Sequence, residues 1–398
     1  MAGLNLSILD DNNGPLDVES AVRDRYSSAS QTAEPSLCCP VDYDRKYLEV
    51  LPAELIERDY GCGDPSKWLQ PGETVLDLGS GGGKICYIAS QVVGPEGRVI
   101  GVDMNDEMLA LAREHQPHVA KDIGYDNVTF FKGRIQDLAL DLDRFEEHLS
   151  ENPAGTASEW LAAETFARTM RATSPMIESN SIDVIVSNCV LNLVSQSDRD
   201  QLFAEMFRVL RRGGRAVISD IVCDEPVPER LQNDPTLWSG CISGAYVEHE
   251  FLDAFADAGF YGMELVDRPV DPWATVEGIE FRSVTVQAFK GKEGDCTDFN
   301  EAVIYRGPWK QVTDDDGHVL RRGVPTAVCR KTFDIYTKAP YADQFLPVPP
   351  RTAIAESDAK PFDCHVGKIR SPQETKGDSF RQTQLPDNTC CGGGDGDC

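Results

Sequence analysis

Residues 75–83 read Val-Leu-Asp-Leu-Gly-Ser-Gly-Gly-Gly, a composition typical of a turn that holds a cofactor. The run follows an expected strand and precedes a helical pattern at 85–93. Glycines allow positive φ and bring backbone amides close to a ligand, as nucleotide sites at a sheet edge require. Asp103 ends the next expected strand, 24 residues after Gly79. This spacing suits a carboxylate that accepts hydrogen bonds from both hydroxyl groups of a ribose.

Two common phosphate-binding motifs do not match the glycine run. A P-loop requires Ser or Thr after its lysine, but Ile85 follows Lys84. The third glycine of a dinucleotide fingerprint that starts at Gly79 would fall on Lys84. The run therefore predicts neither a P-loop nor a complete dinucleotide site.

Cysteines occur in contexts where a thiol could meet a ligand. Cys189 follows an expected strand, and ligands of doubly wound sheets bind at the carboxyl ends of strands. Cys62 lies between two glycines, and Cys241 lies among small residues. Cys38 and Cys39 are adjacent, so they are poor joint ligands for one centre but good partners for thiol exchange. None has the C-x-x-C spacing of zinc sites, and a buried Cys can also be a small hydrophobe.

Short apolar runs alternate with helical patterns through the first part of the chain. The expected strands are residues 74–78, 98–103, 127–131, 182–187 and 215–220. Helical patterns at 107–115 and 199–210 lie between them. This alternation is typical of a parallel sheet covered by helices, so we expect an α/β fold.

Composition changes divide the chain into four parts. We expect a loosely held N-terminal arm at 1–37 and a cofactor-binding domain at 38–224, with a helical insertion at about 141–180. A second domain is expected at 225–290. A third, irregular domain is expected at 299–398, with strand-like pieces around Val303 and Tyr336 and a tail rich in Cys and Gly.

The chain of 398 residues carries a formal net charge of −28 and 13 cysteines. A surface of this charge repels phosphate backbones and anionic lipid head groups, so we expect no nucleic acid and no membrane as partner. The sequence has no apolar run of the ~18 residues that a membrane span needs and no basic region of a signal peptide. We therefore expect a cytoplasmic protein with reduced thiols, and the odd cysteine count also argues against a closed disulfide framework.

The glycine run and Asp103 resemble motifs I and II of the class I S-adenosylmethionine methyltransferases. The cysteine contexts make the resemblance more specific. Tyr-Gly-Cys-Gly at 60–63, Ser-Asn-Cys-Val-x-Asn-Leu at 187–193, Gly-Cys-x-x-Gly-Ala at 240–245 and the Cys-Cys-Gly tail resemble the arsenite S-adenosylmethionine methyltransferase family. The resemblance covers most of residues 38–290 and, more loosely, extends to the C-terminus. It implies a doubly wound Rossmann-like domain, an α+β arsenic-binding domain and a small irregular C-terminal domain.

The same resemblance implies a site for S-adenosylmethionine. Asp103 would hold the ribose, Met104 would pack on the adenine, and Tyr60 would lie against the sulfonium methyl group, because an aromatic face favours a cation. The implied cofactor-binding residues are Asp77, Gly79, Gly81, Asp103, Met104, Ile135, Gln136 and Asn188.

The resemblance also implies roles for five cysteines. Cys189 and Cys241 would be the thiolates that bind trivalent arsenic, supplied as arsenite or its thiol conjugates. Cys62 would pair with Cys38 or Cys39 as a redox couple that glutathione or thioredoxin reopens. The doubled cysteine leaves open which of the two acts. We expect the protein to work as a monomer.

Two other functions are compatible with the same residues. A methyltransferase for an organic small molecule, with redox-sensitive cysteines, would tolerate Cys241→Ser. A non-catalytic metalloid-binding thiol protein would bind trivalent arsenicals without using S-adenosylmethionine. Antimony or selenium as acceptor, the final methylation state and the role of the insertion stay open, as does that of the tail thiols Cys390, Cys391 and Cys398. No role is assigned to Cys86, Cys223, Cys296, Cys329 and Cys364.

Overall fold

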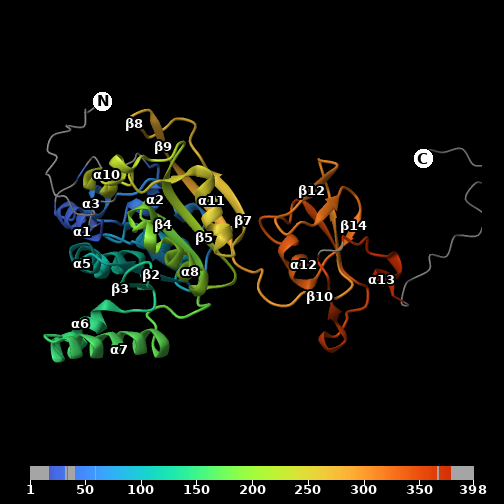
Figure 1. Ribbon diagram of the computed structural model, residues 1–398, viewed down its shortest axis with the longest axis horizontal. Coiled ribbons are helices and arrows are strands. Elements are labelled where there is room, and N and C mark those ends of the chain that lie inside the picture. The colour runs from blue at the N-terminus through green and yellow to red at the C-terminus, as the bar shows by residue number, and fades with distance from the viewer. Residues whose placement is uncertain (1–17, 32–33, 35–40, 59, 365–366, 378–398) are drawn as a thin grey trace, which may run out of the picture. The chain divides into compact units, whose positions relative to one another are not determined.

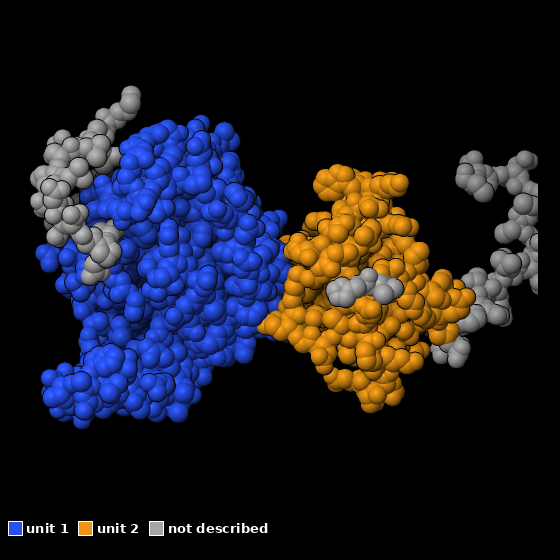
Figure 2. Space-filling view, in the orientation of Figure 1, with its two compact units in different colours: residues 1–291 blue, residues 292–398 orange. Residues whose placement is uncertain are grey.

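The computed structural model describes residues 18–31, 34, 41–58, 60–364 and 367–377. Two compact units make up the chain, residues 1–291 and 292–398, coloured blue and orange in Figure 2. Cys38, Cys39 and the three tail cysteines lie outside the described residues. Among the described residues, no helix has the length and apolar character needed to cross a membrane.

A mixed sheet forms the centre of the first unit (Figure 1). Its strand order is β3-β2-β1-β4-β5-β9-β7. The pairs among β1 to β5 in this order are parallel, whereas β9 runs antiparallel to both β5 and β7. The strands are β1 (Thr74–Leu78), β2 (Arg98–Asp103), β3 (Val128–Lys132), β4 (Ile182–Asn188), β5 (Leu210–Cys223), β6 (Tyr246–Val247), β7 (Tyr261–Asp267), β8 (Ala274–Val276) and β9 (Ile279–Phe289). All five expected strands are present.

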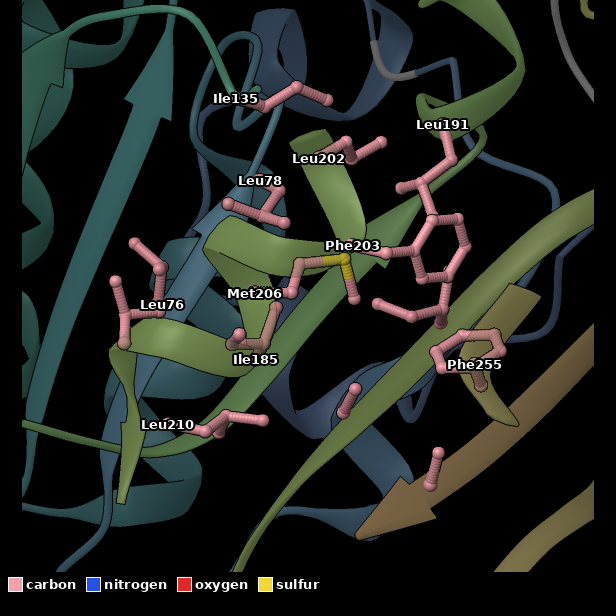
Figure 3. Close-up of a cluster of buried hydrophobic side chains, with 14 of the residues drawn as sticks. Leu76, Leu78, Ile135, Ile185, Leu191, Leu202, Phe203, Met206, Leu210 and Phe255 are labelled. Atoms are coloured by element: carbon pink, nitrogen blue, oxygen red, sulfur yellow. The ribbon is translucent and has the colours of Figure 1, made fainter. Parts of the chain in front are cut away.

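Side chains of the parallel strands are buried on both faces of the sheet because helices cover each face. Val75 and Val99 pack with residues of α4 (Lys84–Val93) and α5 (Asp106–Ile123). On the opposite face, Leu76 packs with α8 (Arg199–Val209) and α11 (Glu248–Asp257). Figure 3 shows Leu76 and Ile185 in the cluster that contains Met206 of α8.

The expected insertion consists of two helices between β3 and β4. These are α6 (Leu142–Glu151) and α7 (Ala157–Thr173). A capping box fixes the start of α7: the Thr156 hydroxyl group accepts from the Glu159 amide, and the Glu159 carboxylate accepts from the Thr156 amide. Trp160 and Leu161 on α7 are exposed.

The expected boundary at residue 224 does not separate two compact units in the structure. Strand β5 pairs with β9 from Arg215 to Cys223, so residues 225–290 extend the same sheet. Two short helices follow β5, namely α9 (Glu229–Gln232) and α10 (Pro235–Ser239). The composition changes after residue 224, but the last strand of this part, β9, returns to the sheet and lies between β5 and β7.

The described part of the expected N-terminal arm forms a helix that packs on the first unit. Helix α1 (Val18–Ala29) lies against α10 and α5. Three short helices lead to β1, namely α2 (Arg45–Leu48), α3 (Ala53–Glu57) and the 3-10 helix η2 (Pro65–Trp68). Two further 3-10 helices follow β4, namely η3 (Leu191–Leu193) and η4 (Gln196–Asp198).

In the described residues of the second unit, short strands accompany two α-helices and a 3-10 helix. Its elements are β10 (Thr297–Asp298), β11 (Ala302–Tyr305), β12 (Gln311–Thr313), β13 (Val319–Arg321), β14 (Pro325–Ala327), α12 (Arg330–Tyr336), β15 (Phe345–Val348), the 3-10 helix η5 (Glu356–Asp358), β16 (Lys360–Pro361) and α13 (Pro372–Lys376). Strand β11 confirms the strand expected around Val303. The strand expected around Tyr336 is wrong, because Cys329 caps a helix that ends at Tyr336, whose ring stacks on Phe345.

Candidate functional site

The turn between β1 and α4 requires glycine at its first position. Gly79 has φ of 70°, and its amide donates to the carbonyl oxygen of Val102 at 2.8 Å. A Cβ atom at Gly79 would lie 2.4 Å from Cγ1 of Val190. The turn is therefore pressed against the segment that follows β4.

Asp103, at the end of β2, is held by backbone amides of two loops. The Gly81 amide donates to Oδ2 at 2.8 Å, and the Asn105 amide donates to Oδ1 at 2.9 Å. Desolvation raises the pKa of Asp103 above its ordinary value, and these hydrogen bonds oppose the shift. Each carboxylate oxygen keeps acceptor capacity for a further donor, such as a ribose hydroxyl group.

A cavity of about 1090 Å³, part of it open to solvent, lies at the carboxyl edge of the sheet. All eight predicted cofactor-binding residues line this cavity, as do Tyr60 and Cys189. Ser80 also lines it, and the buried Ser80 Oγ has no hydrogen-bond partner among the described residues. The glycine turn, the Asp103 carboxylate and this orphaned hydroxyl group fit a ligand with an amino-acid end and a ribose, as S-adenosylmethionine has.

Helix α1 supplies a wall of the cavity that sequence reasoning missed. Val22 and Tyr26, together with Glu19 and Arg23, line the cavity. Gln136 Nε2 donates to the Glu19 carboxylate at 3.3 Å, which ties the helix to the loop after β3. The signal was present in the sequence, because Val18, Val22 and Tyr26 repeat at the four-residue spacing of a buried helix face.

Tyr60 joins the cavity to the N-terminal segment. Its hydroxyl group donates to the carbonyl oxygen of Ala29 at 2.8 Å and accepts from the amide of Glu34 at 3.2 Å. Its ring packs edge to face with Tyr26, with centroids 6.0 Å apart. The hydroxyl group is thus anchored, and the ring is fixed at the cavity wall.

Three of the predicted cysteines meet at the end of β4. Cys62 and Cys189 are joined by a disulfide, with Cα atoms 5.8 Å apart. Cys241 Sγ donates to the carbonyl oxygen of Cys189 at 3.2 Å. The structure thus bonds Cys62 to Cys189, whereas the sequence interpretation paired Cys62 with Cys38 or Cys39.

Asn188 explains why Cys62 lies beside Cys189. Asn188 Oδ1 accepts from the amides of Cys62 and Gly63 at 2.8 and 3.0 Å. Asn188 Nδ2 donates to the carbonyl oxygen of Gly63 at 2.7 Å and to the Tyr43 hydroxyl group at 3.2 Å. Although Asn188 lines the cavity, these four hydrogen bonds hold the Cys62 loop against β4, a role that differs from the cofactor contact expected from the sequence.

Asp220 is a buried carboxylate of the site that sequence reasoning missed. One of its oxygen atoms lies within 4.8 Å of the sulfur atoms of Cys189 and Cys241. Its Oδ2 accepts from the amide of Leu191 at 2.9 Å, and its Oδ1 accepts from Asn192 Nδ2 at 2.8 Å. Burial raises the pKa of Asp220 to about 6, although hydrogen bonds oppose the shift. The available signal was an acidic residue at the end of an expected apolar strand.

Two further cysteines among the described residues of this unit, Cys86 and Cys223, have hydrogen-bond partners of their own. Cys86 donates to the Asp77 carboxylate at 3.2 Å and is buried, and burial together with this carboxylate raises its pKa. Cys223 donates to the carbonyl oxygen of Tyr246 at 3.2 Å, and burial raises its pKa to about 12. Raised pKa values make both thiols poor nucleophiles.

Comparison with known proteins places this site in a family. A model described as a methyltransferase domain matches residues 69–259, and one described as a domain of unknown function (DUF8838) matches residues 292–380. An arsenite methyltransferase of Aquipseudomonas alcaligenes is 32% identical, over 82% of this chain and 90% of its own length. The chain belongs to the arsenite methyltransferase family.

Other members of the arsenite methyltransferase family give the same result. The arsenite methyltransferase of Mus musculus is 29% identical over 88% of each chain. That of Halobacterium salinarum is 37% identical over 52% of this chain and 43% of its own length. The crystal structure of an arsenic(III) S-adenosylmethionine methyltransferase from Chlamydomonas reinhardtii aligns with a TM-score of 0.51 at 26% identity, covering 82% of this chain and all of that one. These matches confirm the expected class I fold and an enzyme that uses S-adenosylmethionine.

Proposed function

We propose that this enzyme methylates trivalent arsenic bound by the thiolates of Cys189 and Cys241. One observation carries the proposal. The Cys241 thiol donates a hydrogen bond to the carbonyl oxygen of Cys189, and Cys189 lines the same cavity as the predicted cofactor-binding residues. Family membership supports arsenite as substrate. In this proposal, residues 225–290 contribute to the arsenic site through Cys241.

Two thiolates and a sulfonium methyl donor suit trivalent arsenic as the methyl acceptor. Trivalent arsenic is soft and prefers thiolates, and two thiolates leave its lone pair free. When bound, S-adenosylmethionine supplies an electrophilic methyl group on a sulfonium sulfur. The part of the protein is to position the arsenic, which by analogy with intramolecular reactions lowers a barrier by about 7–11 kcal/mol. Arsenic carries no proton to remove, so no general base is needed at this step, and the Tyr60 ring contributes a face that favours a cation.

Cys62 and Cys189 together supply the two electrons that methyl transfer consumes. Transfer of the methyl group formally converts arsenic(III) to arsenic(V). Oxidation of the two thiolates to the Cys62–Cys189 disulfide returns the product to arsenic(III), and the bond between Cys189 and arsenic breaks in the same step. Attack on Cys62 by the thiolate of Cys38 or Cys39 then frees Cys189, and glutathione or thioredoxin reduces the resulting disulfide.

Separation of arsenic species after turnover tests this function. The purified chain is incubated with arsenite, S-adenosylmethionine and glutathione, and the products are separated by chromatography with arsenic detection. We expect methylated arsenicals and one molecule of S-adenosylhomocysteine for each methyl group transferred. Unchanged arsenite would overturn the proposal. Arsenite bound without release of S-adenosylhomocysteine would favour a metalloid-binding protein, and methylation of an organic thiol alone would favour the small-molecule enzyme.

A further inference from the structure

Three cysteines without an assigned role converge in the second unit. The Sγ atoms of Cys296, Cys329 and Cys364 lie within 4.8 Å of one another, and none forms a disulfide. Cys296 directly precedes β10, Cys329 directly precedes α12, and Cys364 follows β16. More than 30 residues separate each from the next, so the fold, not local sequence, brings them together.

Backbone hydrogen bonds fix the positions of the three thiols. Strands β10 and β16 pair, and the amide of Phe362 donates to the carbonyl oxygen of Cys296 at 2.8 Å. This contact holds Cys296 close to Cys364. The Thr332 amide donates to Cys329 Sγ at 3.4 Å, and the Thr332 hydroxyl group lies 3.3 Å from the same sulfur. The site is therefore built before any ligand arrives.

The cluster has one buried thiol and two partly exposed thiols. Cys329 is fully buried, whereas Cys296 and Cys364 are partly exposed. Burial raises the pKa of Cys329, but hydrogen bonds from Thr332, Cys364 and Cys296 outweigh burial and lower the pKa below its ordinary value. Burial and the two neighbouring thiols raise the pKa of Cys364. An ion can thus enter from the exposed side and reach the buried thiol of Cys329.

We propose that Cys296, Cys329 and Cys364 bind inorganic trivalent arsenic as a tris-thiolate complex. The inference goes beyond the proposed function and rests on it only for the identity of the ion. In the described part of the chain, this cluster contains three thiols and no His, Asp or Glu. A structural zinc site is closed by four ligands, whereas arsenic(III) completes its pyramid with three thiolates and a lone pair.

The binding step balances without a redox partner. Arsenous acid exchanges its three hydroxyl groups for three sulfur atoms: three S–H bonds and three As–O bonds break, three As–S bonds form, and three water molecules leave. Arsenic stays trivalent throughout. A methylated arsenical has only two such positions, and a dimethylated one has a single position. The cluster therefore favours the unmethylated ion over the products of the enzyme.

Arsenic binding by full-length variants tests the proposal. The background variant carries Cys189→Ser and Cys241→Ser, which removes the ligands of the proposed catalytic site. Reduced protein is incubated with arsenite and desalted, the arsenic retained per chain is counted by mass spectrometry, and its sulfur neighbours are counted by X-ray absorption. We expect one tightly held arsenic with three sulfur neighbours, and weaker retention of dimethylated arsenic.

Two further variants in this background decide which thiols bind. Cys296→Ser changes a partly exposed residue, so the fold should persist, as circular dichroism can check, and tight arsenic binding should be lost. The matched control, with Ser at Cys390, Cys391 and Cys398, should keep it. Retained binding in Cys296→Ser, or loss in the tail control alone, would overturn the proposal.

A further experiment tests whether the three thiols bind zinc in preference to arsenic. Titration of the reduced background variant with Zn²⁺ against a chromophoric chelator should show weaker binding than arsenite, and arsenite should displace the zinc. Zinc that depends on Cys296 and resists arsenite would overturn the assignment to arsenic. Methylation by the wild-type chain is measured separately, so failure of the catalytic proposal and failure of this one give different results.

Discussion

The Cys241 thiol donates a hydrogen bond of 3.2 Å to the carbonyl oxygen of Cys189, across 52 residues of sequence. Both residues have positive φ, 62° for Cys241 and 61° for Cys189. This conformation costs a residue with a side chain of order 1–3 kcal/mol, and proteins keep such strain mainly where it fixes a functional group. The two thiols proposed to share one arsenic ion are therefore held side by side at the expense of backbone strain.

Replacement of Cys241 by Ser should abolish methylation of arsenite. The hydroxyl group is too weak a ligand for a soft ion, and misplacement of the arsenic by even 1 Å can lower the rate about 100-fold. The measurement is the initial rate of methylarsenical formation. Binding of S-adenosylhomocysteine, followed by calorimetry, should stay unchanged because Cys241 is not among the residues that line the cofactor cavity.

Cys223→Ser is the matched control for Cys241→Ser. Cys223 is buried in the same hydrophobic cluster, but its thiol is bonded to the carbonyl oxygen of Tyr246. A serine can keep that hydrogen bond, so the rate should fall by less than about threefold, a change worth under about 1 kcal/mol. Equal methylation rates in Cys241→Ser and Cys223→Ser would contradict the assignment of Cys241 as an arsenic ligand.

Replacement of Asn188 by Ala should weaken the Cys62–Cys189 disulfide. The loss leaves the amides of Cys62 and Gly63 without their acceptor, at a cost of about 1–3 kcal/mol. Each 1.4 kcal/mol corresponds to about tenfold in the equilibrium between dithiol and disulfide. The equilibrium constant is measured by equilibrating the protein in glutathione buffers and quantifying the disulfide by peptide mass spectrometry.

Asn188→Asp separates the acceptor from the donor of that side chain. The aspartate keeps the oxygen that receives the two amides but cannot donate to the carbonyl oxygen of Gly63. We expect a disulfide equilibrium between those of the wild type and Asn188→Ala. If Asn188→Ala had the same equilibrium between dithiol and disulfide as the wild type, the Asn188 side chain would have no part in positioning Cys62.

Local patterns were sufficient to predict the parallel sheet and the glycine turn. Apolar runs rich in β-branched residues mark strands because both faces of this sheet are buried, and β1 and β2 have the predicted bounds. The turn at Gly79 directly follows β1, and Asp103 is the last residue of β2. Short-range spacing therefore placed them correctly around one cavity.

Long-range pairing could not be predicted in the same way. Cys62 and Cys189 are 127 residues apart, and their contact depends on an amide side chain, Asn188, that any surface loop could contain. Asp220 looked like the polar end of a strand, because nothing nearby in sequence shows that it lies beside Cys241. The place of helix α1 in the cavity wall was missed for the same reason. Its apolar stripe packs against α10 and α5, which are distant from it in the sequence.

The free energy of unfolding should fall between pH 4 and pH 6 because of Asp220. Its pKa is about 6 in the folded chain and about 3.9 when unfolded, so in this window the folded state holds a proton that the unfolded state releases. The stabilisation is complete below about pH 4 and is lost as the pH rises through 6, a change of about 3 kcal/mol.

Asp220→Asn isolates that pH dependence. The variant has no ionisable group at this position, so its stability curve should lack this fall even if its absolute stability is lower. Urea unfolding of both proteins from pH 4 to pH 7 gives the difference between the curves. Parallel curves would mean that Asp220 ionises at its ordinary pKa in the folded protein.

Gly79→Ala should weaken cofactor binding by about tenfold or more, because a Cβ at φ of 70° is strained by about 1–3 kcal/mol and would also lie 2.4 Å from Val190 Cγ1. Relief of this clash displaces the turn that faces the cavity. Gly124→Ala, at φ of 88° and with open space around its Cβ, carries similar strain at the end of α5 and should lower stability only. Calorimetry with S-adenosylhomocysteine measures both affinities. Equal affinities would show that the close approach of Gly79 to Val190 has no part in shaping the cofactor site.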